Sequence, residues 1–100
     1  MKLYALHDRK ACAFSSFHVE RSDAQASRGF ADAVRAKDSV FSKYPEDFEL
    51  VSLCDVHAEY DDLPTHMAVG AMEFRVVLSA SQVVSLDAAA SGQLSLLKEA

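Results

Sequence analysis

Three arginines spaced seven residues apart are the side chains of this sequence best suited to binding chemistry: Arg21, Arg28 and Arg35. A spacing of seven returns to nearly the same side of an α-helix, so the three guanidinium groups would form one stripe. Guanidinium groups bind phosphate oxygens in bidentate geometry, which makes the stripe a candidate surface for nucleic acid. The alternative is an ordinary solvated helix face, on which Arg28 pairs with Asp32.

Binding of single-stranded nucleic acid also requires aromatic rings on which bases stack. The basic first half of the chain contains five such rings: Tyr4, Phe14, Phe17, Phe41 and Tyr44. We expect most of them to pack in the core, Phe14 and Phe17 above all, and only Tyr44 to be exposed. The predicted nucleic-acid site therefore consists of Arg21, Arg28, Arg35, Lys37, Lys43 and Tyr44.

No pattern in the sequence predicts catalysis or a metal centre. The four histidines lie far apart, without the Cys-x-x-Cys or His-x-x-x-His spacing of metal ligands. The acidic pairs Glu46-Asp47 and Asp61-Asp62 are better explained as solvated helix-end or loop residues than as magnesium ligands. Neither a Gly-x-Ser-x-Gly frame nor a glycine-rich phosphate loop is present. We therefore expect no enzyme activity, no catalytic residue, no metal and no cofactor.

The two cysteines, Cys12 and Cys54, are interpreted as reduced thiols, because the chain has the features of a cytosolic protein. A disulfide between them requires that their two segments be neighbours. The redox state of the pair therefore stays open at the level of the sequence.

One helix is predicted more clearly than any other element. Ser22 and Gln25 fit a capping box, in which the serine hydroxyl accepts from the third helical N–H. Asp23 lies in the first turn, where the helix dipole favours an acid, and the helix should end near Lys37. Its apolar face would consist of Ala26, Phe30, Ala33 and Val34.

Hydrophobic alternation predicts strands over residues 2–7 and 14–20, which would pair as a hairpin. Residues 39–43 could add one further helical turn before Pro45. The longest strand is predicted over residues 48–57, where a continuous apolar run indicates a central position. Residues 72–78 are predicted as a strand, although a helix is not excluded for them.

These elements predict an α+β fold: a small, mostly antiparallel sheet of three or four strands, with one main helix packed on one face. We expect residues 1–78 to form this single domain. Residues 79–100 are rich in Ser and Ala and lack a convincing helix cap. They are predicted to form a C-terminal tail that is loosely packed or a short helix.

Length and charge narrow the class of protein. The 100 residues suit one domain, and no apolar run approaches the length of a membrane span or signal peptide, so we expect a cytoplasmic protein without a membrane partner. The net charge is −5, but residues 1–45 carry eight Lys or Arg against five acids, whereas residues 46–100 carry two against ten. This asymmetry permits either an anionic partner or self-association, and we expect a homo-oligomer, a dimer or larger.

Four landmarks follow one another in the first part of the chain: residues 1–10, Phe17, residues 22–30 and residues 42–50. The most specific of them is residues 42–50, which contain the run Lys-x-Pro-Glu-Asp-Phe-x-Leu. Their order resembles the non-structural protein of microviruses, the gokushovirus-like bacteriophages with single-stranded DNA genomes, over roughly residues 1–58. This resemblance implies a protein of the infected bacterium's cytoplasm that is not a major virion component and has no catalytic residues to transfer.

The resemblance and the residues together lead to two hypotheses. In the first, the chain is a non-enzymatic phage accessory protein that binds single-stranded DNA, or phage or host replication proteins, during genome synthesis. In the second, it is a protein–protein adaptor or assembly factor that acts as a homo-oligomer without contacting nucleic acid. The net acidity weakens direct DNA binding and argues against a genome-condensing virion peptide, which would be strongly basic.

Overall fold

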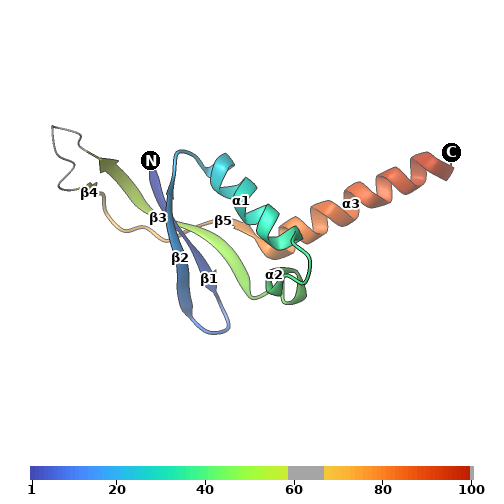
Figure 1. Cartoon of the computed structure of the whole chain (residues 1–100), viewed down its shortest axis with the longest axis horizontal. Helices are drawn as coiled ribbons and strands as arrows, with labels where there is room; N and C mark the ends of the chain where they lie inside the picture. Colours follow the sequence, from blue (N-terminus) through green and yellow to red (C-terminus); the bar gives the residue numbers. More distant parts are fainter. Residues whose placement is uncertain (59–66, 100) are drawn as a thin grey trace.

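The described chain begins with two strands and two helices, continues with three strands and ends in a long helix (Figure 1). The computed structural model describes the backbone of residues 1–58 and 67–99, and the side chains of residues 1–56 and 70–90. The elements are β1 (Lys2–Asp8), β2 (Ala13–Glu20), α1 (Asp23–Arg35), α2 (Val40–Lys43), β3 (Phe48–Ala58), β4 (Met67–Val69), β5 (Arg75–Ser79) and α3 (Ala80–Glu99). The predicted α+β class is confirmed. The acidic segment 59–62 and Pro64 lie outside the described residues.

The sheet is built around β3, and all its pairings are antiparallel. Its main part has the order β2-β1-β3-β5, which confirms the predicted mostly antiparallel sheet. β3 is central because its apolar run is buried on both faces, as shown by Leu50 and Val51, which have no exposed surface. The short strand β4, which the sequence did not predict, pairs with residues 56–58 at the far end of β3.

The helix α1 covers one face of the sheet and begins where the sequence predicted. Ser22 is its N-cap, with an extended backbone, and its hydroxyl accepts a hydrogen bond from the Gln25 N–H at 3.3 Å. The buried residues of α1 join Tyr4 and Leu50 in the larger core cluster. They are Ala26, Phe30, Ala31 and Val34, so Ala31 takes the buried place that was expected for Ala33.

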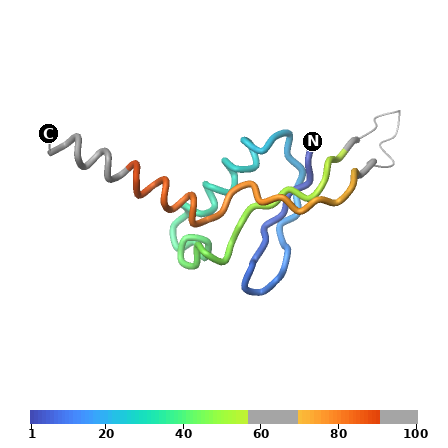
Figure 2. The backbone as a smooth tube through the Cα atoms, turned by 180° about the vertical axis from the view of Figure 1, so that it is seen from behind, coloured from blue at the N-terminus to red at the C-terminus, as the bar shows by residue number. Residues whose placement is uncertain are grey.

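The chain after β5 corrects the prediction of an uncapped tail. The Ser79 hydroxyl accepts from the Gln82 N–H at 3.1 Å, and the Gln82 side chain accepts from the Ser79 N–H at 2.9 Å. This reciprocal capping box starts α3 directly from β5 (Figure 2). Ala80 and Val83 in the first turn of α3 are fully buried in the larger core cluster.

A three-residue polar network joins β1, α1 and β5 at the edge of the core. The Tyr4 hydroxyl donates to Oδ1 of Asp23 at 2.7 Å, and the Arg75 guanidinium donates to both carboxylate oxygens at 2.9 and 3.0 Å. The bonds from Arg75 and Tyr4 lower the pKa of Asp23 to about 2. Burial and the bond to Asp23 raise the pKa of Tyr4. The network therefore fixes the N-terminus of α1 against the sheet.

Candidate functional site: the open face of the sheet

No helix in the described part of the chain covers the sheet face opposite α1. Because side chains alternate along a strand, Tyr4 points toward α1 and Ala5 points to the other side. We call this other side the open face. Its centre is a small buried cluster of Ala5, Val51 and Leu53, and the partly buried Leu3 packs against it.

Four large apolar side chains remain exposed beside that cluster. The exposed fractions are 42% for Phe14, 60% for Phe17, 67% for Met72 and 53% for Phe74. Together with Leu53 and Glu73, these four side chains line a hollow of about 520 Å³. A group of large exposed apolar side chains is typical of surfaces that bind a ligand or a partner.

The rings on this face contact one another in defined geometry. The His7 imidazole is stacked on Phe14, with ring centroids 4.7 Å apart and planes inclined by 26°. Phe74 meets both rings edge-on, at 5.3 Å from His7 and 6.1 Å from Phe14. One side of the Phe14 ring is thus occupied by His7, and its 42% exposure leaves surface for a further flat group.

A hydrogen bond beneath the rings fixes the imidazole. Nδ1 of His7 lies 2.8 Å from Oε1 of Glu49, and both side chains are largely buried. His7 on β1 faces Glu49 on β3 in the register of the sheet, so the pair bridges two neighbouring strands. Its effect is to hold the His7 ring in the orientation that supports Phe14.

A β-bulge in β2 places Phe17. The register pairs Leu6 with Ser15 but Tyr4 with His18, so β2 has one extra residue opposite Ala5. Ser16 within the bulge has a φ of 54°, in the left-handed region, and its carbonyl lies 2.7 Å from Nδ1 of His18. A bulge re-aims the side chains that follow it. Here Phe17, the next residue, is 60% exposed.

Met72 and Phe74 come from the irregular segment before β5. The Gly70 N–H donates to the carbonyl of Asp55 at 2.9 Å, and the Glu73 N–H donates to the carbonyl of Leu53 at 2.6 Å. These two bonds hold the segment along β3, between the parts of β3 that pair with β4 and with β5. As a result, Phe74 reaches the ring of His7, a residue 67 positions earlier in the sequence.

The turn between β1 and β2 brings positive charge to the end of the ring cluster. Arg9 and Lys10 are exposed and directly follow the strand residue Asp8. The Asp8 carboxylate accepts the backbone N–H groups of Lys10 and Ala11, both at 3.0 Å, so it is engaged within the turn. Arg9 and Lys10 thus belong to the turn that leads from His7 on β1 to Phe14 on β2.

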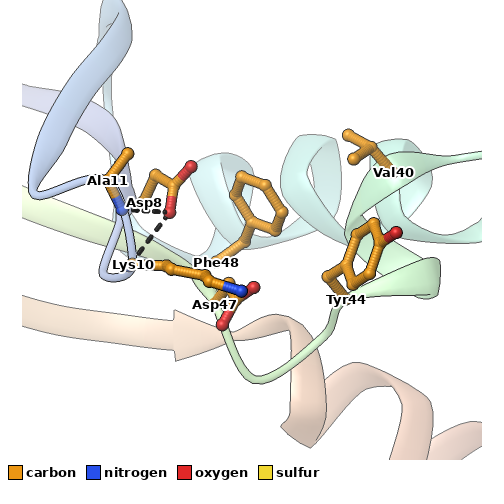
Figure 3. Close-up of a pocket in the computed structure, with 7 residues that line it drawn as sticks. All are labelled: Asp8, Lys10, Ala11, Val40, Tyr44, Asp47 and Phe48. Carbon is orange, nitrogen blue, oxygen red and sulfur yellow. Dashed lines mark hydrogen bonds between the residues drawn. The ribbon is translucent and has the colours of Figure 1, made fainter.

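A second hollow of about 400 Å³ lies on the other side of this turn (Figure 3). It is lined by Asp8, Lys10, Ala11, Val40, Tyr44, Asp47 and Phe48. In Figure 3 the Lys10 side chain extends across the hollow from the turn, and the Tyr44 ring stands opposite it at the end of α2. The Lys43 ammonium lies 5.5 Å from the centre of the Tyr44 ring.

The predicted arginine stripe lies only partly on α1, and its three residues are exposed. Arg21 precedes the N-cap of α1, and Arg28 is exposed on the helix. Arg35 makes a bidentate ion pair with Asp87 of α3, with distances of 2.9 and 3.0 Å. Hydrogen bonding to Arg35 lowers the pKa of Asp87. The Arg35 guanidinium is thus already paired with an acid from the second half of the chain, Asp87.

The other predicted site residues lie near the second helix. Lys37 and Lys43 are exposed, and Tyr44 is 49% exposed at the rim of the hollow in Figure 3. Only Lys43 and Tyr44 are brought into direct contact with each other.

The expectation that Phe14 and Phe17 pack in the core was wrong, and the physical reason is the bulge. Two phenylalanines on one side of a regular strand are separated by an even number of residues, whereas these two are three apart. The odd spacing was therefore the signal for an irregular, exposed strand.

The described residues contain neither a metal cluster nor a bond between the thiols. No group of three His, Cys, Asp or Glu side chains in this part of the chain could hold a metal ion. Cys12 is exposed in the β1–β2 turn and Cys54 is buried in β3, and both are free. None of the helices, in the residues searched, has the length and hydropathy to cross a membrane.

The fold and this face define a small α+β domain with an exposed aromatic surface. The profile of the Phage ORF5 protein family matches residues 1–74, so the chain belongs to that family and is a phage protein. The match spans the whole open face from β1 to Phe74. No curated protein and no solved structure matched the chain.

Proposed function

We propose that this protein is a phage accessory protein that binds single-stranded DNA on the open face of its sheet. The observation that carries the proposal is the set of exposed rings Phe14, Phe17 and Phe74 on one face. The family match supports a role in phage biology, and the resemblance of residues 42–50 to microvirus proteins supports a role in synthesis of a single-stranded genome.

Exposed rings on a sheet suit single strands better than duplex DNA. The bases of a single strand are free to stack, and each base stacked on an aromatic side chain contributes about 1–3 kcal/mol. Phe14 and Phe17 of β2 line one hollow together with Met72 and Phe74. Since every base has a flat face, binding of this kind tolerates any sequence.

Electrostatics set a limit on this binding that can be measured. Arg9 and Lys10 are the cations of the turn that joins the strands of His7 and Phe14, and the whole chain carries a net charge of −5. Two phosphate contacts on a single strand give a slope of about −1.4 for log affinity against log salt. Affinity should therefore fall only about sevenfold between about 50 mM and about 200 mM salt, far less than for a basic DNA-binding protein.

The experiment is a fluorescence anisotropy titration of the full chain with labelled oligo(dT). Replacing two rings, in Phe17→Ala/Phe74→Ala, should weaken binding at least about 30-fold, because two stacking contacts are lost. Leu86→Ala is the matched control, since Leu86 is equally exposed but lies on α3. The variant Arg9→Gln/Lys10→Gln should keep most of the stacking energy and flatten the salt slope toward zero.

Two results would reject the proposal. One is a double ring variant that binds oligo(dT) as tightly as the parent. The other is a parent that does not bind oligo(dT) at all, and that result would favour the adaptor hypothesis, since exposed Phe and Met are also typical of protein interfaces.

A further inference from the structure

The hollow between the β1–β2 turn and α2 combines three kinds of chemistry in one place (Figure 3). Tyr44, Val40 and Phe48 provide a flat ring and apolar walls. Lys10 supplies an ammonium group inside the hollow, and Lys43 supplies another next to the Tyr44 ring. Asp47 adds a carboxylate at the base, so the hollow offers partners for a flat group, an anion and an N–H donor.

We propose that this hollow binds the base and phosphate of one nucleotide, with a preference for guanine. The base would stack on Tyr44, the phosphate would lie against Lys10 and Lys43, and the Asp47 carboxylate would accept from the base edge. The inference deepens the proposed function, because it adds one base-selective position to a surface that is otherwise indifferent to sequence.

The preference follows from what a carboxylate can accept. Guanine presents two adjacent N–H donors, N1–H and the exocyclic amino group, which match the two oxygens of a carboxylate. Thymine presents its N3–H between two carbonyl oxygens, and these oxygens would be repelled by a carboxylate. Among the bases, guanine therefore gains most and thymine least from Asp47.

The backbone holds Asp47 firmly at this position. Its N–H donates to the carbonyl of Tyr44 at 3.1 Å, and its own carbonyl accepts from the Arg9 N–H at 2.7 Å. These bonds join the end of α2 to the β1–β2 turn on either side of the hollow. Asp8, the other acid of the lining, already accepts two backbone N–H groups through Oδ1, so Asp47 is the better base-recognition group.

One turn of the chain lies between the hollow and the first ring of the open face. Lys10 lines the hollow, and the same turn leads into Phe14 at the start of β2. A single strand that leaves the open face around the turn of Arg9 and Lys10 would be led toward the hollow. This placement argues for a nucleotide of a bound strand as the occupant.

The test is an NMR titration of the ¹⁵N-labelled full chain with dGMP, dTMP and inorganic phosphate. We expect dGMP to shift the amides of residues 8–11 and 44–48 and to bind at least about tenfold more tightly than dTMP. Asp47→Asn should remove that preference, and Tyr44→Ala should weaken both nucleotides. Leu86→Ala, an exposed position on α3 outside both hollows, should bind dGMP as the parent does.

Equal affinity for dGMP and dTMP, or phosphate alone producing all the shifts, would overturn the inference. Shifts confined to the open face would overturn it as well. Its failure is distinguishable from failure of the proposed function, because binding of oligo(dT) depends on the open face and not on Asp47. A parent that binds dGMP at the hollow but not oligo(dT) would keep the nucleotide site and reject the DNA surface.

Discussion

Asp23 has a larger structural role than its place in the first turn of α1 indicates. Its carboxylate accepts three hydrogen bonds, two from Arg75 on β5 and one from Tyr4 on β1. The sequence predicted only a favourable interaction with the helix dipole. Tyr4 and Arg75 are 19 and 52 residues away from Asp23 in the sequence, and they meet it only because α1 packs on the sheet that contains β1 and β5.

This network gives the protein a predictable response to acid. The pKa of Asp23 is lowered from its ordinary value of 3.8 to about 2 in the folded chain. The ionised Asp23 carboxylate therefore stabilises the fold fully above about pH 4, and this stabilisation is lost as the pH falls toward 2. Asp23→Asn should lower stability at neutral pH and flatten the loss between pH 4 and pH 2. Urea unfolding at a series of pH values measures both effects.

A graded variant and a control make that test specific. Tyr4→Phe removes one of the three hydrogen bonds and should flatten the acid response only in part. Asp32→Asn removes an acid from the exposed side of the same helix and should leave the response between pH 4 and pH 2 as in the parent. An unchanged acid response in Asp23→Asn would contradict the role of the network.

Ser16 has a strained backbone conformation and lies in the bulge that precedes Phe17 of the open face. A non-glycine residue with a φ of 54° is strained, and glycine adopts that conformation freely. Ser16→Gly should therefore leave the free energy of unfolding unchanged or raise it by up to about 1 kcal/mol. Ser15→Gly, one position earlier in the regular strand, should lower it by about 0.5–1 kcal/mol. Thermal unfolding of the two variants compares them, and the same loss in both would mean that β2 has no bulge.

At the scale of elements, α1 and α3 begin with the same device. Ser22 and Ser79 each accept a hydrogen bond from the N–H three residues later, and each is followed at that position by glutamine. Ser79→Ala should lower the free energy of unfolding by about 1 kcal/mol, as should Ser22→Ala. Ser85→Ala, at an exposed position inside α3, should have no such cost. Chemical denaturation measures all three variants, and a neutral Ser79→Ala would mean that the start of α3 is not stabilised by its cap.

The elements predicted from the sequence were those with strong local signals. The start of α1 followed from its capping box, and the strands β1, β2 and β3 followed from their apolar patterns. The matching capping box at Ser79 went unrecognised because the Ser- and Ala-rich composition around it resembles a loose tail. The open face could not be predicted from the sequence for a different reason. Phe74 belongs to it only through long-range contacts with His7 and Phe14.

The arginine stripe shows the limit of reasoning from spacing alone. The interval of seven residues is real, but Arg21 lies before the helix and Arg35 is engaged by Asp87. No local signal identifies Asp87 as the partner of a residue 52 positions earlier. The candidate site in the structure is therefore the open face of the sheet and not the outer side of α1.

At the scale of the whole molecule, we still propose a homo-oligomer. β2 is the outer strand of the sheet, and a second copy paired along it would join two open faces into one longer surface. The bulge at Ser16 interrupts this edge, so we expect the pairing to be weak. Light scattering at high micromolar concentration should give a mass above that of the 10.9 kDa chain. A mass that stays at 10.9 kDa would remove the proposal.

The central claim is that single-stranded DNA lies on the open face, and photocrosslinking tests it most directly. The full chain would be irradiated with oligo(dT) in which some bases are replaced by bromouracil, digested, and analysed by mass spectrometry for the linked residues. We predict crosslinks at Phe14, Phe17 or Phe74 and their loss when unlabelled oligo(dT) competes. Crosslinks confined to α1, around Arg21 and Arg28, would contradict the account and return the site to the arginine stripe.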